Sequence, residues 1–413
     1  MIAPWQVVAP LGEEEYRRIR RRAIFDCFKW DPQVEDTATL APFPLVLRGE
    51  AWRELATFAA ALARETLAAE AELLERPELH AALALPRRVR AALRQLIPPT
   101  TGVARLIRFD FHYTTDGWRI SEANTDVPGG LNEASGFAAL MAEAYPAVDS
   151  VGDVGLEYVR ALLRASPNGY VALVHATAYT DDHQVMAYVA RHIQALGGRA
   201  ALVSPAQVRW ANGRAYVLGE RSKEPASILA RFFPGEWLED LPRVCTWERW
   251  FRGGVTPTSN PATALLTQSK RLPLVWDRLR TPMRTWRALL PETHDPREVP
   301  WRKNDEWVLK PALGRVGDGI GIRGVTPPKE WRLAARGARW HPRWWIAQRR
   351  FEAVSFPDDG EPTYPCIGVY TIDGRAVGAY GRIASRPLVD WRARDIAVLV
   401  EREGVREQLR RPA

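Results

Sequence analysis

Cysteine and long apolar runs are both scarce in this 413-residue chain, and each scarcity excludes a class of structure. Cys27, Cys245 and Cys366 lie far apart with no C-x-x-C spacing, which indicates reduced thiols and not a disulfide or zinc framework. No stretch approaches about 18 apolar residues, so a membrane-spanning helix is not expected. The first residues lack a basic segment followed by an apolar run, which argues against a signal peptide and favours a cytoplasmic location.

Lysine is scarce as well. Only six of the 57 basic residues are lysine, so the net charge of +8 comes mostly from arginine. A basic protein can bind nucleic acid. Here, however, the arginines are interleaved with glutamate or apolar residues, and the dense run at 17–22 fits the solvated face of an amphipathic helix. The charge therefore suits an acidic small molecule such as a nucleotide better than a nucleic-acid partner.

The length suggests two or three domains. Residues 13–95 carry helix-period patterns, whereas 170–203 has the pattern of a strand, a helix and a second strand. A short hairpin and a strand at 228–233 follow, and this order predicts a small parallel sheet. It lacks G-x-G-x-x-G after its first strand, so a dinucleotide site is not expected there. The composition shifts predict boundaries that divide the chain into 1–165, 166–255 and 256–413.

The last third of the chain combines a predicted helix with predicted strands. Residues 261–279 carry a helical pattern that includes Lys270, and strands are predicted at 307–311 and 343–351. The segment 365–383 has the pattern of a hairpin that turns at an Asp-Gly pair. Together with the parallel sheet, these elements predict an α/β (α+β) protein.

Charged and polar side chains alternate with apolar ones along 108–124, RFDFHYTTDGWRISEAN. A sheet would normally carry apolar or uncharged polar residues at these positions. Alternate residues of a strand share a face. Arg108 and Asp110 therefore point the same way, and Glu122 and Asn124 share a face of the returning strand. His112 lies on the first of these faces and is interpreted as a bystander.

A three-residue loop at 115–117, with glycine last, predicts a register in which Asp110 faces Glu122 and Arg108 faces Asn124. Facing carboxylates repel each other and destabilise the strand pair, so another charge must compensate. The arginine could do so alone, as a structural ion-pair cluster. The alternative is Mg²⁺, which prefers hard oxygen ligands and would bring phosphate towards Arg108.

The segment 312–321 is rich in glycine, which allows backbone amides to approach phosphates closely. It lies between two predicted strands and lacks G-K-[ST], so it is neither a Rossmann fingerprint nor a Walker A loop. By itself it could be a flexible hairpin. Lys310 directly precedes it, and Lys270 lies on the predicted helix before, so two of the scarce lysines neighbour features typical of phosphate binding.

These motifs resemble the glutathionylspermidine synthase-like family of circularly permuted ATP-grasp enzymes. The resemblance covers about 25–400 and rests on R-x-D-x11-E-x-N at 108–124, D-x-P at 126–128, K-P-x-x-G-R-x-G at 310–317 and G-x-Y-x-I-D-G-R-x-x-G-x-Y-G-R at 368–382. The metal hairpin precedes the nucleotide lysines, as in the permuted arrangement. The resemblance implies an ATP-grasp fold with an N-terminal helical region and a small pre-ATP-grasp-like domain with a parallel sheet.

The resemblance also implies ATP and one or two Mg²⁺ ions as cofactors, and it assigns site residues. The implied magnesium ligands are Asp110, Glu122 and Asn124, and the implied catalytic residues are Arg108 and Arg382. The implied ATP-binding residues are Lys270, Lys310, Gly314, Gly317 and Gly319, with Gln348 on the adenine side.

The reaction implied by the family forms an amide. ATP phosphorylates a carboxylate, an amine attacks the acyl phosphate, and ADP and phosphate are released. No glutathione-binding set is recognisable, so the carboxylate and amine substrates are open. Three alternatives stay open: an ATP-grasp phosphotransferase with another acceptor, a catalytically silent nucleotide-binding relative, and a basic nucleic-acid-binding protein.

Overall fold

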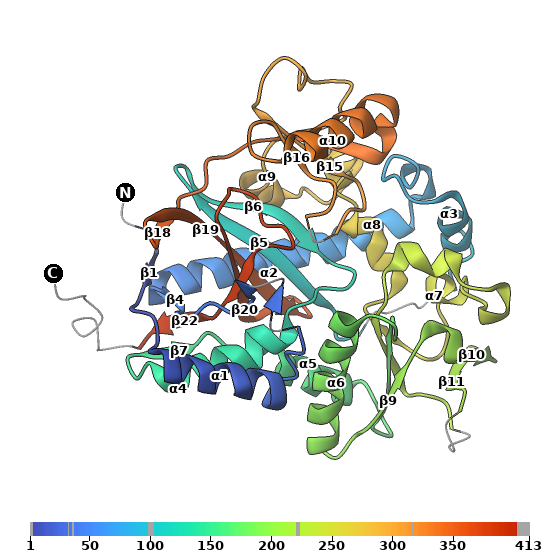
Figure 1. The fold of residues 1–413 in the computed structure, drawn as a ribbon. Coiled ribbons are helices and arrows are strands. Elements are labelled where there is room, and N and C mark those ends of the chain that lie inside the picture. The colour runs from blue at the N-terminus through green and yellow to red at the C-terminus, as the bar shows by residue number, and fades with distance from the viewer. Residues whose placement is uncertain are drawn as a thin grey trace.

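The computed structural model describes residues 3–31, 33–34, 37–97, 103–219, 224–315 and 317–402. Its centre is a six-stranded antiparallel sheet that joins two hairpins from distant parts of the sequence (Figure 1). The strand order is β21-β20-β19-β5-β6, and β18 pairs with β19. The bounds are β5 Leu106–Thr114, β6 Gly117–Asn124, β18 Phe356–Asp358, β19 Glu361–Ile372, β20 Arg375–Ala384 and β21 Arg394–Ile396. The predicted hairpin at 365–383 is confirmed.

The long helix α2 (Gly49–Leu74) packs on this sheet against β19 and β20. Its sequence is rich in alanine, leucine and glutamate, which favour helices. Leu55, Ala59 and Leu62 recur at helical spacing and are fully buried. Each buried leucine contributes about 1.5–3 kcal/mol relative to an exposed one. The apolar stripe of α2 therefore anchors the sheet that carries the site.

A second sheet brings the two ends of the described chain together. Its order is β1-β4-β22-β7, and β22 pairs in parallel with β4, which precedes it by some 350 residues. The helices α1 and α4 contact one another beside this sheet. The elements are β1 Trp5–Val7, α1 Glu13–Asp26, β4 Leu45–Leu47, α4 Ala138–Ala144, β7 Val148–Ser150 and β22 Val398–Glu401, with the small pair β2 Gln33–Val34 and β3 Thr37–Ala38 nearby in sequence. The helical prediction for 13–95 is confirmed by α1, α2 and α3 (Arg87–Leu93).

The predicted small parallel sheet is confirmed, with strand order β13-β12-β8-β9. Helix α6 connects β8 to β9, and a separate two-stranded ribbon, β10 and β11, follows. The elements are α5 Val154–Arg164, β8 Tyr170–His175, α6 Thr180–Ala195, β9 Arg199–Val203, β10 Val208–Ala211, β11 Arg214–Val217, β12 Ile228–Phe232, α7 Arg249–Arg252 and β13 Thr258–Ser259. The domain boundaries near 165 and 255 stay a prediction.

A third unit stands above the central sheet in Figure 1 and carries the glycine-rich loop. Its small antiparallel sheet has the order β14-β17-β15-β16 and is covered by α10. The elements of this unit are β14 Thr293–His294, β15 Trp307–Pro311, β16 Gly321–Ile322, α10 Pro328–Trp340 and β17 Trp345–Arg349. The helices that precede it in the chain, α8 Leu265–Gln268 and α9 Arg284–Leu289, contact α2. Both strands predicted here are confirmed, and the loop connects β15 to β16.

The predicted helix over 261–279 is wrong in its extent. Only α8 and short 3-10 turns form, and Lys270 lies just beyond the Ser269 cap of α8. Pro273 lacks the amide hydrogen that a continued helix requires, which is one reason that the segment breaks into turns. In the part of the chain that the structure describes, no helix is long and apolar enough to cross a membrane.

Candidate active site

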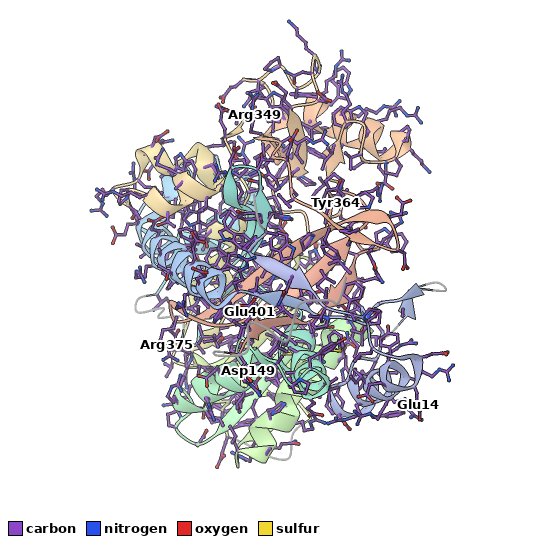
Figure 2. The ribbon with its side chains drawn as sticks, turned by 90° about the vertical axis from the view of Figure 1, so that its left-hand side faces the viewer. Glu14, Asp149, Arg349, Tyr364, Arg375 and Glu401 are labelled. Atoms are coloured by element: carbon purple, nitrogen blue, oxygen red, sulfur yellow. The ribbon has the colours of Figure 1, made fainter. Side chains whose placement is uncertain are left out.

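A cavity of about 620 Å³ lies between the central sheet and the small sheet above it. Val308 and Lys310 line it from β15, and Asp110 and Glu122 line it from β5 and β6. Figure 2 shows another lining residue, Arg349, in the upper part of the molecule, with Tyr364 of β19 in the body below. Two sheets therefore enclose a space that holds every polar residue of the predicted hairpin face.

The predicted pairing of the hairpin is confirmed at the site, where Arg108 faces Asn124 and Asp110 faces Glu122. The predicted loop at 115–117 is wrong, because Thr114 pairs with Gly117 and the connection is two residues long. A β-bulge beyond Asp110 inserts one extra residue, Ser121, into β6 and restores the expected register. The pairing at the site therefore depends on the bulge as well as on the turn.

Asp110 is held by three polar contacts on the sheet surface. Arg108 donates from Nε to Oδ1 at 2.6 Å and from Nη2 to Oδ2 at 3.0 Å, and Asn124 Nδ2 donates to Oδ2 at 3.0 Å. Gly368 faces Asp110 from β19, and a β-carbon there would lie 2.6 Å from Arg108 Cδ. The glycine thus leaves room for a bidentate ion pair, the strong geometry for arginine and carboxylate.

The negative charge of the Glu122 carboxylate is compensated by lysine. Lys270 Nζ lies 3.0 Å from Glu122 Oε2, and it also donates to Gly314 O at 2.6 Å. Burial alone would raise the pKa of Glu122, but the charges of Lys270, Lys310 and Arg108 lower it to about 2. The two facing carboxylates therefore each have their own cation, and Glu122 stays ionised at neutral pH.

Lys310 reaches the same surface from β15. It donates to Ser121 O, the carbonyl of the bulge, at 2.9 Å and to Gln348 Oε1 at 2.7 Å. Burial lowers the pKa of Lys310 to about 8; Glu122 opposes the shift and Lys270 adds to it. Gln348, predicted on the adenine side, lines the cavity and is fixed by a bond from Nε2 to Thr293 Oγ1 at 3.0 Å. Its amide therefore orients Lys310.

His112 shares the face of Asp110 and lines the cavity. Its Nε2 lies 3.1 Å from Ser121 Oγ, and its ring lies against Phe351. Burial, together with the charge of Lys310, lowers its pKa to about 4. The imidazole is therefore neutral near pH 7, and no phosphate contact can rely on its charge.

The glycine-rich loop closes one side of the cavity. Gly317 and Gly319 have φ values of +73° and +71°, a left-handed conformation that favours glycine. Between Gly314 and Gly317 the side chain of Arg315 lies 2.7 Å from Asp126 and 2.7 Å from Glu236. The loop is thus tied to the end of the central hairpin and to the parallel-sheet unit by one arginine.

Arg382 lies on β20 opposite Cys366 and lines the cavity. Its Nη2 donates to Asp390 O at 2.6 Å, and its Nε is 3.9 Å from Asp395 Oδ1. Its carboxylate neighbour is therefore Asp395, whereas that of Arg108 is Asp110. The cavity contains all predicted polar site residues except Lys270, which lines a small adjoining hollow with Glu122.

The sequence interpretation missed a second charged group in the cavity. Lys29 Nζ lies 2.6 Å from Glu133 Oε1, 2.9 Å from Asp395 Oδ2 and 3.0 Å from Asp31 Oδ1. Lys29, Glu133 and Asp395 are all less than 9% exposed in their side chains. Lysine scarcity was the available signal, because a third lysine of the six proves to lie at the site.

The donor set of the hairpin fits Mg²⁺ only with help from a substrate. Among the described residues, no group of three or more histidine, cysteine or acidic side chains is placed to hold a metal ion. Asp110, Glu122 and Asn124 offer oxygen atoms, and Mg²⁺ commonly takes one or two carboxylates and completes its shell with water and phosphate. The residues therefore fit a magnesium ion that arrives with a phosphate ligand.

The two facing sheets and the enclosed lysines define an ATP-grasp-related, synthetase-like fold. The sequence model described as "Glutathionylspermidine synthase preATP-grasp" matches residues 43–401, so the chain belongs to that family. A solved structure of a glutathione synthetase-like effector from Globodera pallida, in apo form, superimposes with a TM-score of 0.64. It shares 9% sequence identity, over 93% of this chain and 96% of the effector.

A second solved structure, assigned as a gamma-glutamylcysteine synthetase from Methylobacillus flagellatus KT, has a TM-score of 0.45 and 13% identity. The match covers 78% of this chain and 82% of that protein. No curated protein matches the sequence. The family is thus established by the sequence model, and the fold by the effector structure.

Proposed function

We propose that the protein is an ATP-dependent carboxylate–amine ligase that forms an amide through an acyl phosphate. The observation that supports this most is the convergence of three cations, Arg108, Lys270 and Lys310, on the carboxylates Asp110 and Glu122 beside one cavity. A purely structural cluster has no need of a large enclosed space. A triphosphate with its metal does, because it brings both negative phosphate oxygens and a positive metal ion to such a surface.

Phosphoryl transfer depends chiefly on alignment and charge neutralisation. Lys270 and Lys310 would hold the phosphates of ATP, and Arg108 would face the phosphoryl group in transfer. Mg²⁺, held by Asp110, Glu122 and Asn124, would supply further neutralisation of the phosphate oxygens. When phosphates bind, the cations exchange carboxylate partners for phosphate partners, and the carboxylate oxygens become free.

The apolar side chains between the two sheets suit the base of the nucleotide. Val308, Ile320, Ile322 and Leu388 line the cavity and pack together. Gln348, with both amide atoms bonded, holds Lys310 at the border between this apolar part and the charged part. Nucleotide sites commonly combine an apolar lining with a few fixed polar groups.

In the first step, a carboxylate oxygen of the substrate attacks the γ-phosphorus. The bond from that phosphorus to the bridging oxygen breaks, and its electron pair leaves with ADP. In the second step, the amine nitrogen attacks the acyl carbon, the carbon–oxygen bond to phosphate breaks, and the nitrogen loses a proton. The glycine-rich loop, held by Arg315, would keep water from the acyl phosphate.

The test uses hydroxylamine, which intercepts acyl phosphates as hydroxamates without knowledge of the natural amine. Purified protein with MgATP is incubated with a panel of short peptides and carboxylic acids, and ADP and hydroxamate are measured by mass spectrometry. Both products should appear with the true carboxylate and disappear in Glu122→Gln. Glu361→Gln, an exposed glutamate on β19, is the matched control and should leave both unchanged.

Two outcomes would contradict the proposal. If MgATP fails to bind, the nucleotide site itself is wrong. If ADP forms with a phosphorylated acceptor that hydroxylamine cannot trap, the protein is a phosphotransferase on the same fold.

The carboxylates of Glu133 and Asp395 lie beside Lys29 in the same cavity. They are not needed to hold phosphate, so in this proposal they mark the end of the cavity at which an amine would enter.

A further inference from the structure

The carboxylate group at the far end of the cavity already holds a cation that belongs to the chain. An ammonium group has three hydrogen-bond donors. Lys29 Nζ lies close to the oxygens of three carboxylates, at 2.6 Å from Glu133, 2.9 Å from Asp395 and 3.0 Å from Asp31. The lysine is 4% exposed. Its ammonium therefore occupies the place where a primary amine would bind best.

The chain places Lys29 there through an unusual backbone conformation. Helix α1 ends at the Cys27 cap, and Phe28 follows with φ of +57°, in the left-handed region. The amide of Lys29 then donates to Ala23 O at 2.9 Å, which closes the helix end. Arg191 lies over the Phe28 ring at 4.6 Å and covers the turn. A non-glycine residue in this conformation is uncommon, and here it forms the turn that ends α1 directly before Lys29.

Two of the three carboxylates also accept a hydrogen bond from an uncharged side chain of the protein. Gln184 Nε2 donates to Asp31 Oδ1 at 2.7 Å, and Tyr380 Oη donates to Asp395 Oδ1 at 2.7 Å. Together with Lys29, these donors engage both carboxylates from the protein side. An additional ammonium group would have to share these carboxylate oxygens with donors that belong to the chain.

This group is close to the proposed reaction centre. Tyr380 links the two, because its hydroxyl bonds Asp395 while Arg108 lies over its ring at 5.3 Å. Lys29, Asp395 and Arg108 all line the same cavity. An amine that attacks an acyl phosphate near Arg108 would extend its remaining chain along this wall.

We propose that Lys29 is a resident ammonium that fills the carboxylate pocket of the acceptor end, and that it limits the amine substrate to monoamines. A diamine or polyamine would bring a second ammonium to a pocket that the chain has already occupied. Asp181 and Asp182 also line this end, but they are exposed or half-exposed, so water competes for any cation there. This inference rests on the proposed function and specifies its amine substrate.

The test removes the resident cation and offers a replacement. Binding of propane-1,3-diamine is measured by calorimetry for the wild type, Lys29→Ala, Lys29→Met and Lys29→Arg. Alanine empties the pocket, methionine fills it without charge, and arginine keeps the charge. Lys29→Ala should bind the diamine at least about tenfold more tightly than the other three proteins, because only there do three carboxylates face a vacant space.

Thermal denaturation covers the case in which Lys29→Ala folds poorly. Ethylamine, which carries one ammonium, should raise the melting temperature of Lys29→Ala and leave that of Lys29→Met unchanged. The proposal is overturned if the wild type binds the diamine as tightly as Lys29→Ala does. It is also overturned if neither amine binds or stabilises Lys29→Ala.

Binding of MgATP to the same four samples separates this inference from the proposed function. Neither amine measurement uses ATP, so each result stands without turnover. If the wild type binds MgATP and the diamine prediction fails, only the role of Lys29 is wrong. If the wild type fails to bind MgATP, the ligase proposal fails whatever the diamine does, and the monoamine limit fails with it.

Discussion

Replacing Glu122 by glutamine separates a metal ligand from a simple partner of lysine. The carboxylate lies 3.0 Å from Lys270 Nζ, and Lys310 also acts on its charge. Without it, both ammonium groups lose a negative neighbour, and metal-free ATP should bind about tenfold more tightly because its phosphates meet less competition. Binding of ATP with Mg²⁺ should weaken, because one of two carboxylate ligands is gone.

The size of the loss follows from the strength of charged contacts. An interaction with a charged group contributes about 1.5–3 kcal/mol, which corresponds to about 10- to 100-fold in affinity. The quantity to measure is the ratio of ATP dissociation constants in EDTA and in Mg²⁺, obtained by calorimetry. That ratio should fall in Glu122→Gln by about 100- to 1,000-fold, because the dissociation constant in EDTA falls about tenfold while the one in Mg²⁺ rises about 10- to 100-fold.

Lys270→Met is the matched control, since it removes the partner and keeps the carboxylate. It should weaken ATP binding with and without Mg²⁺ and leave the ratio close to that of the wild type. If Glu122→Gln keeps the wild-type ratio, the glutamate serves only to neutralise lysine. The hairpin would then be a structural ion-pair cluster, and the magnesium assignment would be refuted.

Three further predictions concern neighbouring groups. Burial lowers the pKa of Lys310 to about 8, so this cation is lost as the pH rises through that value. The affinity for ATP should therefore fall above about pH 8. Lys310→Arg should remove this fall in affinity, because arginine stays charged. Asp126→Asn breaks a fully buried pair with Arg231 and should cost about 3–5 kcal/mol of unfolding free energy in urea. Burial would raise the pKa of Asp126, but Arg231 and Arg315 hold it below its ordinary value. The stability advantage over Asp126→Asn should therefore be full above about pH 4 and shrink as the pH falls through the lowered pKa; an advantage that does not change with acid would contradict this. Arg315→Met should weaken ATP binding about tenfold, because it frees the glycine-rich loop from Asp126 and Glu236, whereas unchanged binding would show that the loop needs no such tie.

Local sequence patterns predicted most of the elements that carry the site. Alternation along 108–124 placed Arg108 and Asp110 on one face, and the strand pairing opposed Asp110 to Glu122 as expected. The parallel sheet and the hairpin at 365–383 were also readable, because side-chain period and turn residues are set by neighbours in the chain. Turn length and helix extent were less predictable, as the bulge at Ser121 and the short α8 show.

The charge partners of Glu122 and Asp395 were not predictable, because each pair joins segments that are far apart. Lys270 meets Glu122 across 148 residues, and Lys29 meets Asp395 across more than 360. No local period encodes such a contact. It exists only because β22 lies beside β4 and because β15 faces the central sheet across the cavity.

The sequence by itself determined which residue types are available and which face of each strand they occupy. Only the tertiary structure decided which lysines lie beside Glu122 and Asp395. Burial in a shared cavity raises the cost of an isolated charge, so each carboxylate takes the cation that the fold brings nearest. For Glu122 that cation is Lys270, for Asp110 it is Arg108, and for Asp395 it is Lys29, a residue that no local pattern had connected with the site.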